Sequence, residues 1–218
     1  MKKFIFYLFT TILTAIFFLS SNVKALDIET IYLPEPRKES GEPLMKVLNN
    51  RKSTRDFSDR ELSLQTLSDL LWAGFGINRP ESGKRTAPSA VNWQEIDIYI
   101  ANKKGLYIYN AKDHRLDPIH GKDIRNLTGT QNFVKDAPLN LIYVADYSKM
   151  GNSSKEQKDF YSAADTGFIS QNVYLYCASA GLATVVRALI DREKLNKEMN
   201  LKHNQKIILA QTVGYPVK

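Results

Sequence analysis

The chain has 218 residues, 43% of them hydrophobic, and carries 30 Lys and Arg against 23 Asp and Glu, a formal net charge of +7. That length and composition allow one globular domain with a substantial core. The sequence has no nucleic-acid-binding motif or basic stripe with interleaved aromatics, which excludes nucleic acid as an expected partner, and its one cysteine and three scattered histidines predict neither an intramolecular disulfide nor a metal site.

Residues 1–25 have the pattern of an export signal. Two lysines form a positive n-region, an apolar run follows over residues 4–19, and small residues lead up to Ala25. We expect cleavage near Ala25 and a periplasmic or extracellular location, with membrane attachment only if the signal stays uncleaved; the apolar run is short for a bilayer span. The segment contains three lysines and no acidic residue, so its removal lowers the formal charge from +7 to +4.

Residues 26–42 hold two prolines, a glycine and several charges, and they predict an extended N-terminal arm ahead of a single domain over residues 43–218. Residues 43–50 predict a short helix. The run Arg51-Lys52-Ser53-Thr54-Arg55-Asp56-Phe57 follows it directly. Arginine offers a fork of donors that matches phosphate, and hydroxyls add short hydrogen bonds. The run is therefore a candidate phosphate site; the alternative is a solvated charge run.

The next segments alternate between helix and strand patterns. An apolar stripe at helical spacing predicts a helix over residues 63–77, with Ser63 as its N-cap. Residues 78–94 are rich in Asn, Pro, Gly, Ser and Lys and predict a loop. Alternating polar and apolar residues predict strands at 95–100 and 105–110, joined by a short turn.

Further along the chain the patterns remain mixed. The expected elements are a central strand at 139–145, a long helix at 160–180 ended by Gly181, a short extended segment at 184–186, a helix at 189–199 with Asp191 near its start, and a last strand at 206–214. Cys177 lies in the apolar pattern of the long helix, which indicates a buried, inert thiol. Two adjacent strands amid mixed helices favour an α+β fold over a doubly wound parallel sheet.

Three further motifs accompany the basic run, in this order: Thr86-Ala87-Pro88-Ser89-Ala90-Val91-Asn92-Trp93-Gln94, Gly181-Leu182-Ala183-Thr184-Val185-Val186-Arg187-Ala188 and Val213-Gly214-Tyr215-Pro216. Together they resemble the nitroreductase family of FMN flavoproteins, from about Pro43 to Pro216. Within that family the chain is most similar to the SagB-type dehydrogenase branch, which includes the flavin oxidases that make thiazole and oxazole rings in peptides. The resemblance implies a central, mostly antiparallel sheet flanked by helices, and an interlocked homodimer with shared active sites.

The same resemblance implies FMN as the cofactor and assigns its contacts. The implied contacts are Arg51, Ser53 and Arg55 at the phosphate and ribityl chain, with Lys52 adding charge; Pro88, Ser89 and Ala90 against the ring, usually from the partner subunit; Asn92 and Gln94 as polar side chains nearby; and the backbone of Val186, Arg187 and Ala188 at the flavin edge. The Arg187 side chain either turns inward toward N1 and O2 or lies at the surface. The resemblance also implies that variable loops and helices, here around 111–135 and 148–160, form the pocket walls.

The activity implied is FMN-dependent oxidoreduction: ping-pong hydride transfer through flavin N5 to or from an unidentified small molecule or peptide. NAD(P)H, or a redox protein outside the cytoplasm, would supply the electrons. The alternatives are a non-catalytic flavin-binding or scaffold protein that keeps the fold outside the cytoplasm, and a flavin-free interaction protein.

The chain also departs from the family pattern. Only Lys218 offers a basic group after the last strand, and Ala90 stands where many members have a second serine. No counterpart of the Lys-Tyr pair of the ring-oxidising enzymes is found; Tyr161, Tyr174 and Tyr176 are more typical of packing or interface residues.

Overall fold

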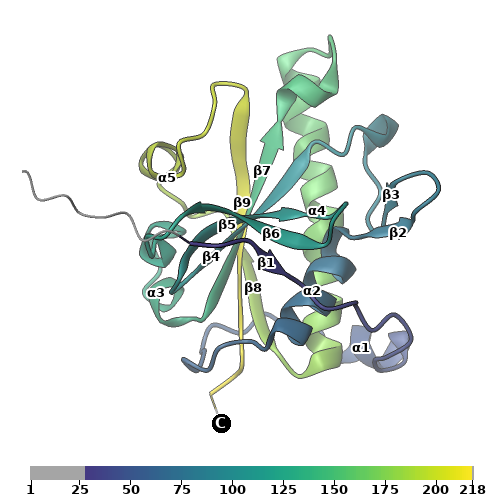
Figure 1. The fold of residues 1–218 in the computed structure, drawn as a ribbon, viewed down its shortest axis with the longest axis vertical. Helices are drawn as coiled ribbons and strands as arrows, with labels where there is room; N and C mark the ends of the chain where they lie inside the picture. The colour runs from purple at the N-terminus through teal and green to yellow at the C-terminus, as the bar shows by residue number, and fades with distance from the viewer. Residues whose placement is uncertain (1–27, 218) are drawn as a thin grey trace, which may run out of the picture.

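The computed structural model describes residues 28–217 and contains a seven-stranded sheet with helices on both faces (Figure 1). The expected export signal, residues 1–25, lies outside the described residues. Within them the strand order is β1-β6-β5-β4-β7-β9-β8, and every neighbouring pair is antiparallel. The predicted α+β class with a central antiparallel sheet is confirmed.

In chain order the elements are β1 (Ile31–Tyr32), α1 (Leu44–Asn50), α2 (Leu64–Phe75), β2 (Ile77–Arg79), β3 (Lys84–Arg85), η1 (Ala90–Asn92), β4 (Ile96–Asn102), β5 (Gly105–Asn110), β6 (Arg115–His120), η2 (Arg125–Leu127), α3 (Phe133–Asp136), β7 (Leu139–Asp146), η3 (Tyr147–Met150), α4 (Lys155–Ala180), β8 (Ala183–Arg187), α5 (Arg192–Met199) and β9 (Gln205–Gly214). The sequence predicted nine of these seventeen elements to within about five residues, namely α1, α2, β4, β5, β7, α4, β8, α5 and β9. None of the helices in the described part of the chain is long and apolar enough to cross a membrane.

Side-chain caps fix the ends of the main helices. The Ser63 hydroxyl accepts a hydrogen bond from the Thr66 amide at the start of α2, as predicted. Helix α4 begins at Lys155, five residues before the predicted start, because Ser154 and Gln157 form a capping box. It ends where Gly181 adopts a left-handed conformation with φ of 68°.

The core has two layers because the sheet is buried on both faces. Leucines of α2 and the buried side of α4 pack on one face against strands β4 and β7. On the opposite face, Leu195 and Met199 of α5 pack on Ile142 and Val144 of β7. Strand β7 lies between β4 and β9, and seven of its eight residues are buried. The apolar run at 139–145 therefore marks a central strand, as predicted.

Regular structure occurs at two places where the sequence predicted none. Residues 78–94, expected as a loop, include most of the small β2–β3 hairpin and the short helix η1, so that prediction was wrong. Residues 115–120 form strand β6 of the main sheet, which was not predicted. Strand β6 pairs with β5 through Pro118 and Asp117, whose sequence carries little of the apolar alternation that indicates a strand.

The N-terminal arm packs along the domain from residue 28 onward. Strand β1 extends the sheet by pairing Ile31 with Leu116. Further along, the backbone amide and Nε of Arg37 donate to the buried carboxylate of Asp69 in α2, at 2.8 and 2.9 Å. The arm is thus tied to the sheet and to α2.

Candidate functional site

The basic run (Arg51–Phe57) lies against the edge of the sheet. It leaves α1 in an extended conformation, and the Thr54 amide donates to the Thr184 carbonyl of edge strand β8 at 2.9 Å. Phe57 then forms a bridge with Pro216 beyond β9. These backbone contacts hold the run in place, so its side chains have defined directions.

Tyr174 of α4 joins the run to β8. Its hydroxyl lies 2.8 Å from the Ser53 Oγ and accepts a hydrogen bond from the Val186 amide at 2.9 Å. The Arg51 guanidinium carbon lies 5.3 Å from the centre of the Tyr174 ring, a distance typical of cation–π contact. The structure therefore brings Arg51, Ser53 and Val186 together around a tyrosine that the sequence indicated only as a packing residue.

A cavity of about 610 Å³ opens beside the same tyrosine. This volume falls within the range of roughly 300–1,000 Å³ typical of cofactor and ligand pockets. Alternate residues of an extended segment point to opposite sides, and only one side of the run faces this cavity. Its walls include Lys52, Thr54 and Asp56 from the run, Tyr174 and Cys177 from α4, and Thr184 from β8. Cys177 is buried, as predicted, and burial raises the pKa of its thiol.

The cations of the run have no acidic partner within 4 Å among residues 28–217. Nine ion pairs occur in that part of the chain, and Arg51, Lys52 and Arg55 belong to none of them. Arg55 and Lys52 are exposed, and Arg51 is half-buried. Three positive groups held on an ordered segment create a positive potential that an anion would neutralise.

The second predicted part of the site is the ring loop (residues 88–94). The Ala90 amide donates to the Asp165 carboxylate of α4 at 2.9 Å, and the Ser89 hydroxyl accepts from the Gln94 amide at 3.0 Å. Val91, Asn92 and Gln94 all have positive φ, of 51°, 58° and 48°. Such values are uncommon for residues other than glycine. Pro88 and Asn92 are exposed, so the loop presents an ordered surface held by internal contacts.

Helix α4 separates the two parts of the site within one chain. The ring loop contacts Asp165 and the basic run contacts Tyr174. Both residues are buried, and they are nine positions apart, so an α-helix places them roughly 13 Å apart along its axis. The two parts of the site therefore contact different stretches of the helix.

Arg187 is buried, which excludes the expected alternative of a surface side chain. The side chain is only 6% exposed. Its guanidinium donates to the Thr128 carbonyl and hydroxyl, to the Asn140 Oδ1 at 2.6 Å and to the Thr212 Oγ1 at 3.1 Å. Burial lowers the pKa of Arg187 to about 10. The Arg187 guanidinium therefore donates to other parts of the chain and anchors β8. The next residue, Ala188, is exposed.

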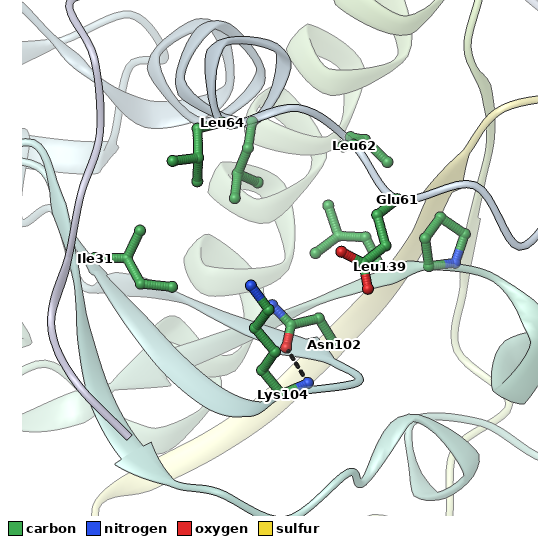
Figure 2. A pocket seen from close by; sticks show the side chains of 9 residues that line it. Ile31, Glu61, Leu62, Leu64, Asn102, Lys104 and Leu139 are labelled. Carbon is green, nitrogen blue, oxygen red and sulfur yellow. Dashed lines mark hydrogen bonds between the residues drawn. The ribbon is translucent and has the colours of Figure 1, made fainter. Parts of the chain in front are cut away.

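A smaller cavity of about 70 Å³ lies between the arm, the start of α2 and the sheet (Figure 2). Ile31, Leu64 and Leu139 supply apolar walls, and Glu61 and Lys104 reach it from loops. It contains none of the predicted site residues and has room for only a few water molecules.

Comparisons with known proteins show the family to which the chain belongs. The family model described as "Nitroreductase family" matches residues 48–215. A Methanocaldococcus jannaschii protein assigned to the nitroreductases is 32% identical over 161 residues, which cover 69% of this chain and 81% of that protein.

Solved structures give the same picture. A crystal structure from Ralstonia eutropha JMP134, also assigned to the nitroreductases, is 44% identical with a TM-score of 0.84, and the match covers 88% of this chain and 91% of that one. The Escherichia coli microcin synthetase McbBCD complex shares the fold at 20% identity and a TM-score of 0.67, over 85% of this chain and 78% of that one. The NADPH:FMN oxidoreductase of Vibrio harveyi shares it at 17% identity and a TM-score of 0.61, over 80% and 69%.

Proposed function

This chain belongs to the nitroreductase family, and on that premise we propose that it is an FMN-dependent oxidoreductase. The observation that carries the proposal is the ordered basic run. Arg51, Lys52 and Arg55 have no acidic partner among the described residues, and Ser53 connects the run to β8 through Tyr174.

The residues present fit the FMN phosphate in charge. Arg51 and Arg55 would hold the dianionic phosphate, and the Ser53 hydroxyl would donate to a phosphate or ribityl oxygen. Lys52 lines the neighbouring cavity and adds positive charge there. Asp56 lines the same cavity, and its negative charge would repel an anion there. We therefore assign the closest phosphate contacts to Arg51 and Arg55.

When bound, FMN would supply hydride transfer at its N5 atom in a ping-pong cycle. The protein's part is to bind and orient the ring. The ring loop, with Pro88, Ser89 and Ala90, would give a wall held against α4, with Asn92 as a polar side chain beside it. Ala188 and the end of β8 would face the flavin edge, and buried Arg187 keeps that strand in place through Thr128, Asn140 and Thr212.

We propose a homodimer in which each site is shared. The ring loop contacts α4 at Asp165 and the basic run contacts it at Tyr174, nine residues further on, so the loop of one chain would complete the site of the other. The outward face of α4 supports this arrangement: Phe160 is 68% exposed, Phe168 is 49% exposed, and the space over Gly167 is open. Leu44 and Met45 of α1 add further exposed apolar surface. A second copy of the chain would cover this face.

The finer assignments rest on the motifs of this chain. The Ala-Pro-Ser-Ala loop at 87–90 and the Gly-Tyr-Pro ending at 214–216 support the SagB-type dehydrogenase branch, with a small molecule or a peptide as substrate. We propose residues 1–25 as a cleaved export signal and 26–42 as an arm on one domain over 43–218. An exported enzyme would meet little NAD(P)H, so a redox protein outside the cytoplasm is the electron donor that we favour there.

The second candidate is a protein that binds flavin without turning over. One feature favours it: Ala90 lacks the hydroxyl that many family members have at this position. Such a protein would keep the dimer and the cofactor while no donor reduces it.

The absorbance spectrum of the purified mature protein, before and after addition of FMN, tests the proposal. We expect a yellow protein whose flavin is bleached by at least one donor in an anaerobic stopped-flow survey. Protein that stays colourless after FMN addition would rule out both candidates. A yellow protein that none of the donors reduces would favour the second.

A further inference from the structure

Two buried carboxyl groups, those of Glu95 and Asp165, lie within hydrogen-bonding reach of each other behind the ring loop. Glu95 immediately precedes β4 and is 0% exposed, and Asp165 on the inner side of α4 is 3% exposed. Neither carboxyl oxygen of Glu95 accepts a hydrogen bond from any of residues 28–217. One oxygen of Asp165 accepts the Ala90 amide at 2.9 Å. The catalytic scheme proposed above uses neither group.

The surroundings of the pair disfavour two negative charges. Burial, followed by the nearby Asp165 charge, raises the pKa of Glu95 to about 7. Burial also raises the pKa of Asp165, and its bond from Ala90 opposes that rise. Two residues of η3 also lie near the two carboxyl groups. The positive charge of Lys149 favours the charged form of Glu95, but the Lys149 ammonium is paired with Asp97 at 2.7 Å. Tyr147 is the other residue of η3 near Glu95.

We propose that Glu95 and Asp165 share one proton, and that this proton positions the ring loop. Glu95 keeps the proton and donates it in a hydrogen bond to Asp165, which stays charged and accepts the Ala90 amide. Two carboxyl groups at one site in a low-dielectric interior hold one proton between them, because the second ionisation is opposed by the first charge. The inference deepens the proposed function and rests on it, since the loop is the expected wall of the flavin ring.

The loop depends on this support because its backbone is strained at three positions. Positive φ at Val91, Asn92 and Gln94 persists only where surrounding contacts enforce it. The bond from the Ala90 amide to Asp165 is one of those contacts. When Glu95 loses its proton, repulsion between the two carboxylates displaces Asp165 and weakens its hold on Ala90.

The sign of the pH dependence follows from the raised pKa. Glu95 binds its proton more tightly in the folded chain than in the unfolded chain, where its ordinary value is 4.5. Its contribution to stability is therefore complete below about pH 4.5 and is lost as the pH rises through about 7. Gln at position 95 keeps a donor for Asp165 at every pH and removes this dependence.

The test measures thermal unfolding of the FMN-free full chain, and its FMN affinity, between pH 5.5 and 8.5. The variants are Glu95→Gln, Asp165→Asn and Glu81→Gln, a matched control because Glu81 is exposed on the β2–β3 turn. For the wild type and the control we expect the melting temperature to fall by on the order of 5 °C over this range. Glu95→Gln should lose that slope and exceed the wild type at pH 8.5.

FMN affinity, measured by fluorescence quenching, reports on the loop itself. The flavin phosphate ionises near pH 6, so each variant is compared with the control at the same pH. Between pH 6 and pH 8.5, we expect the FMN affinity of the control to fall on the order of fivefold more than that of Glu95→Gln. The inference would be overturned if the melting temperature of Glu95→Gln fell with pH as it does in the wild type. It would also be overturned if the ratio of FMN affinities between Glu95→Gln and the control were the same at pH 6 and pH 8.5.

If Glu95→Gln does not fold, Asp165→Asn carries the test. Without the Asp165 charge, the stability loss of the wild type should move to lower pH, and an unmoved transition would refute the shared proton. Absence of FMN binding at every pH would instead reject the proposed function, while the thermal measurement would still decide whether the pair shares a proton.

Discussion

The Tyr174 hydroxyl lies 2.8 Å from the Ser53 Oγ, although 121 residues separate the two in sequence. The same hydroxyl accepts the Val186 amide. One phenol therefore fixes the distance between the basic run and edge strand β8, the two elements that would meet the cofactor from one subunit.

Tyr174→Phe removes this connection. The Val186 amide loses its partner in a half-buried position, so we expect a loss of about 1–3 kcal/mol in unfolding free energy, measured in urea. FMN affinity should fall as well, because Ser53 is no longer oriented. Tyr161→Phe is the control, since its side chain is exposed and its hydroxyl makes no hydrogen bond among the described residues. If Tyr174→Phe and Tyr161→Phe gave superimposable denaturation curves, the role of Tyr174 in joining the basic run to β8 would be contradicted.

Arg187→Ala and Arg55→Ala should behave in opposite ways. Loss of Arg187 leaves buried acceptors on Thr128, Asn140 and Thr212 unpaired, which should cost about 3 kcal/mol or more in unfolding free energy. Loss of exposed Arg55 should change stability by less than about 0.5 kcal/mol.

FMN titration completes this comparison. Arg55→Ala should weaken FMN binding on the order of tenfold, because it removes a charge-assisted contact to phosphate. A stable Arg187→Ala variant, or wild-type FMN affinity in Arg55→Ala, would reverse the roles assigned to these residues.

Gly167→Arg places a charge at the proposed dimer interface. The space over Gly167 is open in the single chain, so the fold itself should tolerate the substitution. Light scattering should show a monomer, and FMN binding should be lost because neither chain contains a whole site. Glu193→Arg, on the exposed side of α5, should remain dimeric and yellow. A dimer that persists in Gly167→Arg would place the interface elsewhere.

His114 gives a pH dependence opposite in sign to that of Glu95. The His114 ring contacts the Ser68 hydroxyl at 2.7 Å and the Tyr109 hydroxyl at 2.9 Å, and burial lowers its pKa below the ordinary 6.5. The unfolded chain therefore binds the proton first, so this contribution to stability is present above pH 6.5 and is lost as the pH falls through the lower folded-state pKa.

NMR titration of the His114 ring checks this sign, and its midpoint should lie below 6.5. In thermal unfolding, His114→Asn should flatten the loss between pH 6.5 and 5, and Asn tolerates the positive φ of 47° at this position. A midpoint at or above 6.5 would refute the effect of burial.

Local signals predicted most of the fold. Ser63 marks the start of α2 with a side-chain cap, and Gly181 marks the end of α4 through its backbone conformation. The apolar run of β7 identifies a buried strand from its own residues alone. Strand β6 was missed because Asp117 and Pro118 interrupt the alternation, and its pairing with β5 depends on a partner that local sequence does not reveal. Registers and strand order likewise depend on contacts between distant segments.

The candidate site divides in the same way. The motifs identified Arg51, Ser53 and Arg55 by type and spacing, and these residues lie on an ordered segment. The direction of Arg187 was not predictable, because it depends on acceptors that three other segments bring to one place. Asp165 carried a usable signal: it is an acid on the inner face of a helix whose other inner residues are apolar or small.

The position of the basic run also affects how the chain behaves in crowded solution. Strand β8 ends the sheet, and an uncovered edge strand is a template onto which other chains can add and aggregate. On the outer side of β8, the Thr184 carbonyl accepts a hydrogen bond from the Thr54 amide, and the Val186 amide donates to the Tyr174 hydroxyl. The strand at the opposite edge of the sheet, β1, is only two residues long. The segment that would recognise phosphate therefore also protects the molecule against intermolecular strand addition.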